Sequence, residues 1–120
     1  MQEFLVISTS VDLVRVASDD IVFVSSDGNY SSFVFASSES RIVNLQLGQV
    51  ERLLAKQLPQ SGSNFIRIGK SLIINRLYIH YINLHKQLLV LTAGQMVSHT
   101  LSASKEALRQ LKELIEKETK

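Results

Sequence analysis

The sequence predicts a mainly β fold that has one mid-chain helix and one C-terminal helix. Apolar and β-branched residues form short runs between polar turns over residues 4–45 and again over 64–101, which is typical of strands. Between and after these regions, apolar residues recur every three or four positions, which indicates amphipathic helices. The chain has 120 residues, 45% of them hydrophobic and 20% charged, so we expect one domain over residues 1–120 with its own core.

The first half is expected to form short strands joined by tight turns. Asp27, Gly28 and Asn29 give a strong turn signal between two apolar runs. Phe33 and Phe35 alternate with other residues, which indicates a strand with one buried face. The expected strands are 4–8, 13–17, 21–25, 30–36 and 41–45.

Two helices frame the second group of strands. Helical spacing predicts the first helix over residues 47–58, and Pro59 ends it. The C-terminal helix is expected to follow a serine cap, either Ser102 or Ser104, whose hydroxyl accepts from a backbone N–H. The strands expected between the helices are 64–68, 71–74, 78–84, 88–92 and 96–101, with a hairpin turn at 93–95.

The charges are unevenly distributed along the chain. Residues 1–51 carry seven carboxylates and two basic side chains, whereas residues 52–105 carry seven basic side chains and no carboxylate. This asymmetry predicts an anion-binding surface if the fold gathers the basic residues on one side. The alternative is a chance clustering whose charges are scattered around the molecule.

Several classes of function lack the residues that they need. The chain has no cysteine, which excludes disulfides, thiolate metal sites and thiol nucleophiles. His80 and His85 have an odd spacing, which on a strand places two side chains on opposite faces, so they are poor joint metal ligands. Neither G-x-S-x-G nor a phosphate-binding glycine motif is present, so neither an enzyme nor a bound cofactor is expected. No segment could span a bilayer and no signal peptide is apparent, so a cytoplasmic protein without membrane insertion is expected.

Two segments of the chain resemble motifs of the LytTR DNA-binding domain family. Residues 65–75, FIRIGKSLIIN, are similar to the central motif F-x-R-[IV]-H-[RK]-S-[YF]-[IL]-V-N. Residues 21–30, IVFVSSDGNY, are similar to the upstream motif I-x-[YF]-[IV]-E-[AS]-x-[GD]-N-Y. The expected mid-chain helix lies between the two, as in the family, and the resemblance extends from about Val11 to Lys117.

The resemblance implies a LytTR-like arrangement of several small antiparallel sheets whose loops enter the major groove of double-stranded DNA. Most members of the family are transcription regulators, often with a phospho-receiver domain ahead, and this chain resembles a stand-alone, response regulator-like member. Three loops become candidate DNA contacts. By position, the resemblance assigns the contacts to Asn29, Tyr30, Ser31, Ser32, Arg67, Lys70, Ser71, Ser102, Ser104 and Lys105.

Three of these assignments have a structural alternative. Asn29 is compatible with a role in the turn alone. Tyr30 is equally compatible with a place in the core, and Arg67 with an ion pair to the acidic first half of the chain. Ser102, Ser104 and Lys105 are expected at a helix N-terminus, where backbone N–H groups favour a phosphate.

Two departures from the family pattern concern base reading. Gly69 stands where the family often has His, and Ala103 stands where it commonly has Arg, which can bind guanine at about 1–3 kcal/mol of discrimination. We therefore expect phosphate contacts to be kept and base reading to be reduced. The alternative is a protein-interaction module with little DNA affinity, which pairs with another LytTR regulator or with a membrane partner. Separately, edge strands of such a fold could pair two chains into a homodimer.

Overall fold

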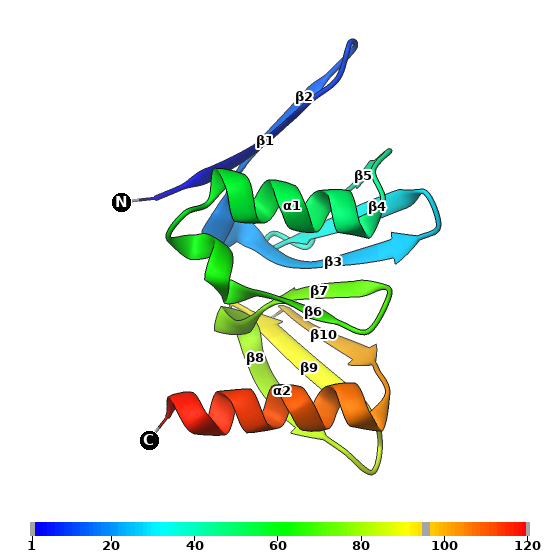
Figure 1. The fold of residues 1–120 in the computed structure, drawn as a ribbon, viewed down its shortest axis with the longest axis vertical. Coiled ribbons are helices and arrows are strands. Elements are labelled where there is room, and N and C mark those ends of the chain that lie inside the picture. Colours follow the sequence, from blue (N-terminus) through cyan, green and yellow to red (C-terminus); the bar gives the residue numbers. More distant parts are fainter. Residues whose placement is uncertain (1, 95–96, 120) are drawn as a thin grey trace.

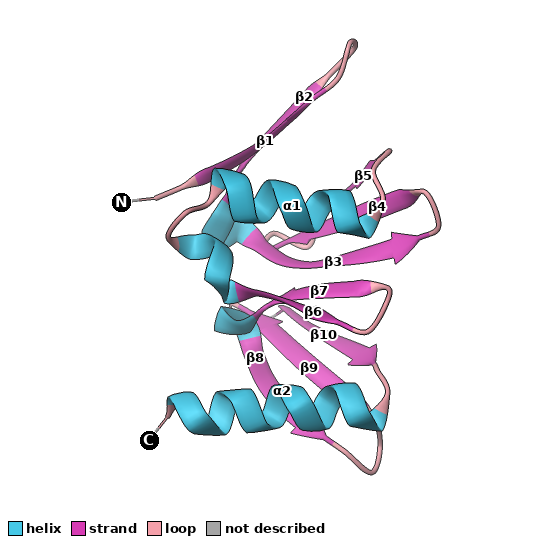
Figure 2. Cartoon of the chain, in the orientation of Figure 1, coloured by secondary structure: helices cyan, strands magenta, loops and turns pink. Residues whose placement is uncertain are grey.

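The computed structural model describes residues 2–94 and 97–119 and has ten strands and two α-helices in that part of the chain (Figures 1 and 2). The helices are α1 (Leu47–Gln57) and α2 (Lys105–Glu118), and three short 3-10 helices precede β3, β6 and β8. The strands are β1 (Phe4–Ser8), β2 (Leu13–Ala17), β3 (Ile21–Asp27), β4 (Tyr30–Phe35), β5 (Ser40–Val43), β6 (Phe65–Ile68), β7 (Leu72–Asn75), β8 (Ile79–Asn83), β9 (Leu88–Ala93) and β10 (Val97–Ser102).

The strands form three small antiparallel sheets, which confirms the predicted fold class. The central sheet has five strands in the order β5-β4-β3-β7-β6. A three-stranded sheet has the order β10-β9-β8, and β1 pairs with β2 in a separate hairpin. α1 lies on one side of the central sheet, and the three-stranded sheet with α2 lies on the other (Figure 1).

Two hydrophobic cores flank the central sheet because successive strand residues point to opposite faces. Val24 of β3 pairs in register with Ile73 of β7, and both lie in the core beneath α1. The neighbouring pair, Phe23 and Ile74, lies in the second core with residues of β9 and α2. His99 of β10 also packs there, edge-on against Phe23, with ring centroids 5.3 Å apart. The central sheet thus holds the two halves of the molecule together.

The β1–β2 hairpin, which we call the arm, leaves the body of the molecule at an angle (Figure 1). Its base is anchored because Leu5 and Ile7 are buried in the core beneath α1. The side-chain amide of Gln57, in α1, accepts from the Val6 N–H at 2.8 Å and donates to the Val6 carbonyl at 2.9 Å. Gln57 therefore occupies the outer edge of β1 as a neighbouring strand would.

Most strand boundaries agree with the sequence within one or two residues, and the differences have local causes. β5 ends at Val43 rather than at Leu45, because the Leu45 carbonyl instead accepts from the hydroxyl of Ser31 at 2.7 Å. β8 begins at Ile79 rather than at residue 78, because Arg76–Tyr78 form a 3-10 turn. The predicted strand 96–101 and turn 93–95 extend into residues 95–96, which lie outside the described residues.

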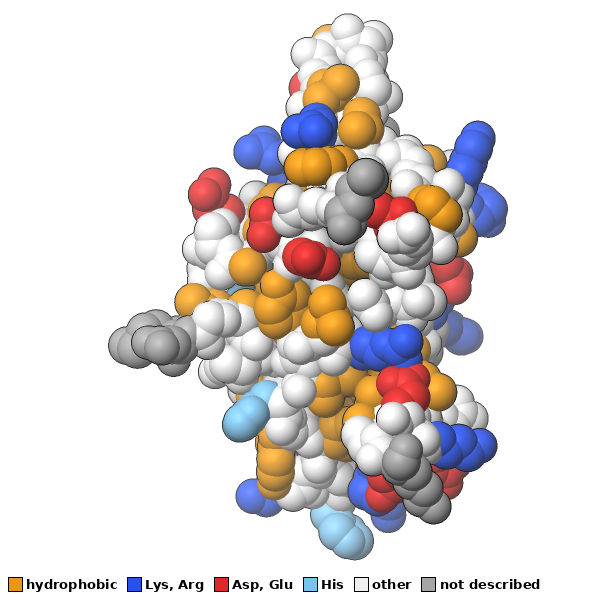
Figure 3. All heavy atoms as spheres, turned by 90° about the vertical axis from the view of Figure 1, so that its left-hand side faces the viewer, with side chains coloured by type: hydrophobic (Ala, Val, Ile, Leu, Met, Phe, Trp, Pro, Cys, Tyr) orange, Lys and Arg blue, Asp and Glu red, His pale blue; other side chains and the backbone are white. Residues whose placement is uncertain are grey.

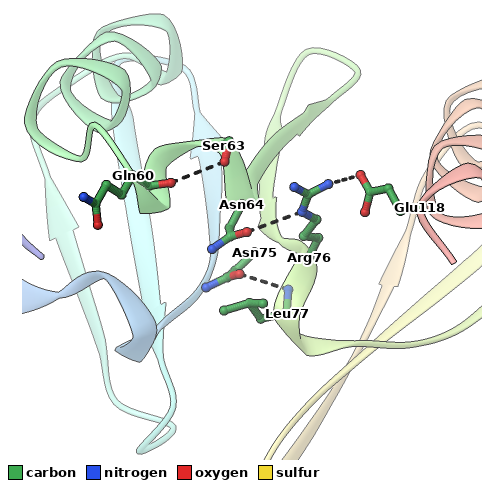
Figure 4. A network of polar contacts seen from close by, with 7 residues as sticks. All are labelled: Gln60, Ser63, Asn64, Asn75, Arg76, Leu77 and Glu118. Atoms are coloured by element: carbon green, nitrogen blue, oxygen red, sulfur yellow. Dashed lines mark hydrogen bonds and ion pairs between the residues drawn. The ribbon is translucent and has the colours of Figure 1, made fainter. Parts of the chain in front are cut away.

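A network of polar contacts fixes the chain between β7 and β8 (Figure 4). Asn75 is 1% exposed; its Nδ2 donates to the Ile21 carbonyl at 2.9 Å, and its Oδ1 accepts from the Leu77 N–H at 3.0 Å. Arg76 pairs with Glu118 near the end of α2 and donates to Asn64 at 3.4 Å. Arg76 therefore links α2 to the central region.

Candidate nucleic-acid interface

The connections that the sequence marks as DNA contacts lie on one side of the molecule, at the right of Figure 1. This side, which we call the loop face, consists of the β3–β4 turn, the start of α1, the β6–β7 turn, the β8–β9 turn and the β10–α2 connection. The hairpin register explains part of this arrangement. Because Asp27 pairs with Tyr30 and Ile68 with Leu72, the β3–β4 and β6–β7 turns close at the same end of one sheet.

At the first turn, Asn29 is hydrogen-bonded to the start of α1. Gly28 has a φ of +66°, a left-handed conformation that suits the first position of a two-residue hairpin turn. Asn29 follows it, and its Oδ1 accepts from Nε2 of Gln46 at 3.1 Å. Gln46 is the N-cap residue of α1, and its own N–H donates to Oε1 of Gln49 at 2.9 Å. Two exposed amide side chains therefore form one unit on the loop face.

The Arg67 side chain holds the β6–β7 turn against α1. Its guanidinium donates to the carbonyl oxygens of Gly69 at 3.4 Å and Lys70 at 3.1 Å, and pairs with Glu51 of α1 at 3.1 Å. The predicted ion pair with the acidic first half is therefore present. Arg67 stays on the surface, with its side chain 32% exposed, so the ion pair is accessible to solvent.

The β6–β7 turn and the β10–α2 connection together line a small hollow of about 210 Å³. Its lining includes Lys70 and Ser71 from the turn and Ser102, Ala103 and Ser104 from the connection. The Ser104 hydroxyl caps α2 by accepting from the Ala107 N–H at 3.2 Å, so Ser104, and not Ser102, is the predicted cap. A lysine, serine hydroxyls and the positive end of a 14-residue helix meet here, which suits an anion such as a phosphate.

The β8–β9 turn borders the same connection from the far side. Nε2 of Gln87 donates to the Ala103 carbonyl at 3.3 Å, and the Gln87 carbonyl accepts from the Ala103 N–H at 3.4 Å. Lys86, next to Gln87, is exposed. The turn thus adds a basic residue beside the α2 N-terminus.

The fold separates much of the charge between the two ends of the central sheet. The guanidinium groups of Arg52 and Arg67 both lie near Gly48. The Nη1 atom of each is 3.8 Å from the point where a Cβ atom would lie if Gly48 were alanine. With Lys70, Lys86 and Lys105, five of the seven basic residues in 52–105 therefore lie at the loop face. Lys56 and Arg76 lie elsewhere, in the last turn of α1 and beside the end of α2.

Acidic residues gather at the other end of the same strands. Asp19 and Asp20 directly precede β3, and Asp20 and Glu39 line one hollow beside Phe35, the last residue of β4. Figure 3 shows this opposite face, where Asp and Glu side chains appear among apolar ones. Burial, Asp20 and Asp19 raise the pKa of Tyr78, whose hydroxyl donates to the Asp19 carbonyl. The basic and acidic groups are thus largely at opposite ends, and the acids near the loop face include Asp27, Glu51 and Glu106, which lies in the first turn of α2.

Three predicted contact residues of β4 have different surroundings. Tyr30 is 52% exposed, so it lies on the surface and not in the core. Ser32 is half-buried and lines a hollow with Tyr30 and Ile42. Ser31 is 0% exposed, and its hydroxyl donates to the Leu45 carbonyl, so the structure does not place it on the loop face.

The comparisons with known proteins agree with this geometry. The model of the LytTr DNA-binding domain family matches residues 12–116 of the chain. The chain belongs to the LytTR family of DNA-binding domains. A solved structure of similar fold is the LytTr DNA-binding domain of a protein described as a methyl-accepting/DNA response regulator from Bacillus cereus. It has 16% sequence identity and a TM-score of 0.66, over 94% of this chain and 96% of that chain. No curated protein matches.

LytTR domains are DNA-binding rather than enzyme domains. Two further observations concern membrane-spanning helices and metal ligands. No helix in residues 2–94 and 97–119 is long and apolar enough to cross a bilayer. Within the same residues, no three His, Asp or Glu side chains lie together as a set of metal ligands.

The sequence reasoning overlooked three residues of the loop face of this LytTR domain. Gln46, Arg52 and Lys86 reach it because α1 begins beside Asn29 and because the β8–β9 turn contacts Ala103. The sequence showed Arg52 of α1 and Lys86 of the β8–β9 turn only as basic residues, without their position on the loop face. No sequence pattern marked Gln46, because its position depends on how α1 meets the β3–β4 turn.

Proposed function

We propose that residues 1–120 act as one DNA-binding domain of a transcription regulator and bind duplex DNA through the loop face. The β3–β4 and β6–β7 turns and the β10–α2 connection would enter the major groove. The observation that carries the proposal is the gathering of five basic side chains on the side that also presents these loops, away from the acids at the start of β3. Phosphate neutralisation is the main source of affinity for duplex DNA.

Separate groups on the loop face would hold separate phosphates. Lys70, Ser71 and the N-terminus of α2 line one hollow, and Ser102, Ser104 and Lys105 belong to the same site. Arg52 and Arg67 would reach a second phosphate beside the start of α1. Arg67 is partly neutralised by Glu51, so its contribution is smaller than that of a free arginine.

Base reading is expected to be reduced at two positions of the loop face. Gly69 has a φ of +62°, a left-handed conformation that favours glycine, so the absence of a side chain there is compatible with the backbone. Ala103 has no side-chain hydrogen-bonding group, and its backbone N–H and carbonyl are already hydrogen-bonded to Gln87. Neither position can supply the side-chain donors that read guanine.

A fluorescence anisotropy titration of a mixed-sequence duplex tests the proposal. With about four phosphate contacts, the affinity should fall about 150-fold between about 50 and 200 mM salt. Lys70→Ala should make the slope of log affinity against log salt shallower by about 0.9. Lys56→Ala, an exposed lysine in the last turn of α1, is the matched control and should leave the slope unchanged. Absence of binding at the lower salt concentration would overturn the proposal.

A second candidate function is a protein-interaction module that pairs two copies of this chain. Large apolar side chains are exposed along the arm, at the start of β4 and on the edge strand β5: Val11, Leu13, Tyr30 and Ile42, at 89%, 59%, 52% and 70%. A groove of about 440 Å³ separates the arm from β5 and is lined by three of these four. A protein interface gives a shallow salt dependence, and a dimer that Ile42→Ser dissociates in sedimentation equilibrium would favour this function.

A further inference from the structure

The amide pair of Asn29 and Gln46 offers a route to base reading that neither Gly69 nor Ala103 provides. The two side chains come from different elements, the β3–β4 turn and the N-cap of α1, and their amides meet at 3.1 Å. Both residues are exposed on the loop face. Their mutual hydrogen bond uses only part of the hydrogen-bonding capacity of each amide, which has two N–H donors and a carbonyl acceptor.

The groups that remain free make a mixed pattern. Because Gln46 Nε2 donates to Asn29 Oδ1, the Nδ2 donors of Asn29 remain free. The Gln46 side-chain oxygen accepts from the Gln49 backbone N–H in the capping box of α1, which fixes the orientation of this amide, and the oxygen keeps a second lone pair. The pair therefore presents a donor beside an acceptor.

This mixed pattern complements one base edge in the major groove. Adenine presents the N7 acceptor and the N6 donor, and amide side chains recognise it through that combination. Guanine presents two acceptors, N7 and O6, and so requires two donors, as an arginine supplies. We infer that the Asn29–Gln46 pair reads an adenine in the major groove, so that this domain prefers an A·T pair at one position of its site. The inference rests on the proposed function, because the loop face must lie on DNA.

The pair is held in place before any DNA arrives. Asn29 sits in a two-residue turn after Gly28, and the Gln46 backbone is fixed by its N–H bond to the Gln49 side chain at 2.9 Å. Each amide also restrains the other, so little side-chain freedom is lost on binding. A single exposed glutamine without such partners would lose more rotamer freedom on contact.

Selection of bound duplexes from a random pool tests the inference with four proteins: the unaltered chain, Gln46→Met, Asn29→Ala and the control Gln110→Met. Gln110 is an exposed glutamine on α2. The unaltered chain and the control should enrich adenine at one position by about 5- to 150-fold, the range of one good bidentate contact. Gln46→Met and Asn29→Ala should each flatten that same position, and a fifth protein that carries both substitutions should change it no further.

The variants are expected to fold, because both side chains are exposed and loss of the Gln46 cap destabilises the chain only modestly; circular dichroism spectra equal to that of the unaltered chain would verify this. Duplexes retained by all four proteins with the same base frequencies would overturn the inference while leaving the proposed function intact. Retention of no duplex by any of them at low salt would overturn the proposed function, and the inference with it.

Discussion

Replacement of Asn75 by leucine tests whether one buried amide holds the junction of the central sheet and the three-stranded sheet. Asn75 is 1% exposed at the end of β7, and its two hydrogen bonds reach the Ile21 carbonyl of β3 and the Leu77 N–H (Figure 4). Leucine has nearly the same shape, so Asn75→Leu removes both bonds without opening a cavity. The Ile21 carbonyl and the Leu77 N–H are then left without their partners.

The expected loss follows from these two groups. The buried Ile21 carbonyl, left unsatisfied, costs about 1–3 kcal/mol, and the Leu77 N–H costs less, about 1 kcal/mol, because Leu77 is 57% exposed and its bond is only part-buried. The added apolar burial of leucine offsets part of this by about 1–2 kcal/mol. A net loss of about 1.5 kcal/mol in the free energy of unfolding corresponds to about 6 °C in Tm for a chain of this length.

Thermal and urea unfolding, followed by circular dichroism, measure both quantities. Asn44→Leu is the matched control, because Asn44 is exposed and its replacement should change the stability by less than about 0.5 kcal/mol. Equal Tm values for Asn75→Leu and the unaltered chain would refute the reasoning. A change in the urea m-value without a change in midpoint would also refute it, since it would point to the unfolded state.

Three further outcomes are expected. Glu51→Gln frees Arg67 for a phosphate, so duplex binding in the anisotropy titration should tighten at low salt and its salt slope should steepen by about 0.9; an unchanged slope would show that Arg67 does not contact DNA. The pKa of the Tyr78 hydroxyl is raised in the folded chain, so the unfolded chain releases the hydroxyl proton first as pH rises above about 10, and the free energy of unfolding should fall there. Over the same pH range, the urea midpoint of Tyr78→Phe should fall less steeply than that of the unaltered chain. Ser104→Ala removes the cap of α2 and should cost about 1 kcal/mol of stability in the same unfolding assay, whereas Ser98→Ala, at an exposed position of β10, should cost less.

The local pattern of the chain was sufficient to predict its elements. Alternation and β-branched runs located the strands, and the spacing of Leu47, Val50 and Leu54 predicted α1, because these residues are buried on one helix face. Asn75 is a further local case, because its side chain accepts from the N–H of Leu77, two residues on. These features depend on residues close together in the chain.

Features that depend on distant residues were predicted less well. Ser31 was expected on the surface, yet its hydroxyl is buried against Leu45, 14 positions away. Arg76 pairs with Glu118 from the far end of the chain, and no sequence pattern marked this pair. Which side chains share the loop face depends on how α1 and the three-stranded sheet pack on the central sheet, and no short sequence pattern encodes that packing.

The bond between Gln57 and Val6 has a consequence for the protein at high concentration. An exposed strand edge is a template on which other chains can add, and the arm would offer two such edges. Gln57 closes the edge of β1 with a side chain from the same molecule. In the described part of the chain, the arm then has one open edge, that of β2. In the central sheet, the edge strand β5 contains Arg41, whose charge disfavours pairing with another strand. The glutamine closes one strand edge and the arginine places a charge on another, which reduces the number of edges on which further chains can add.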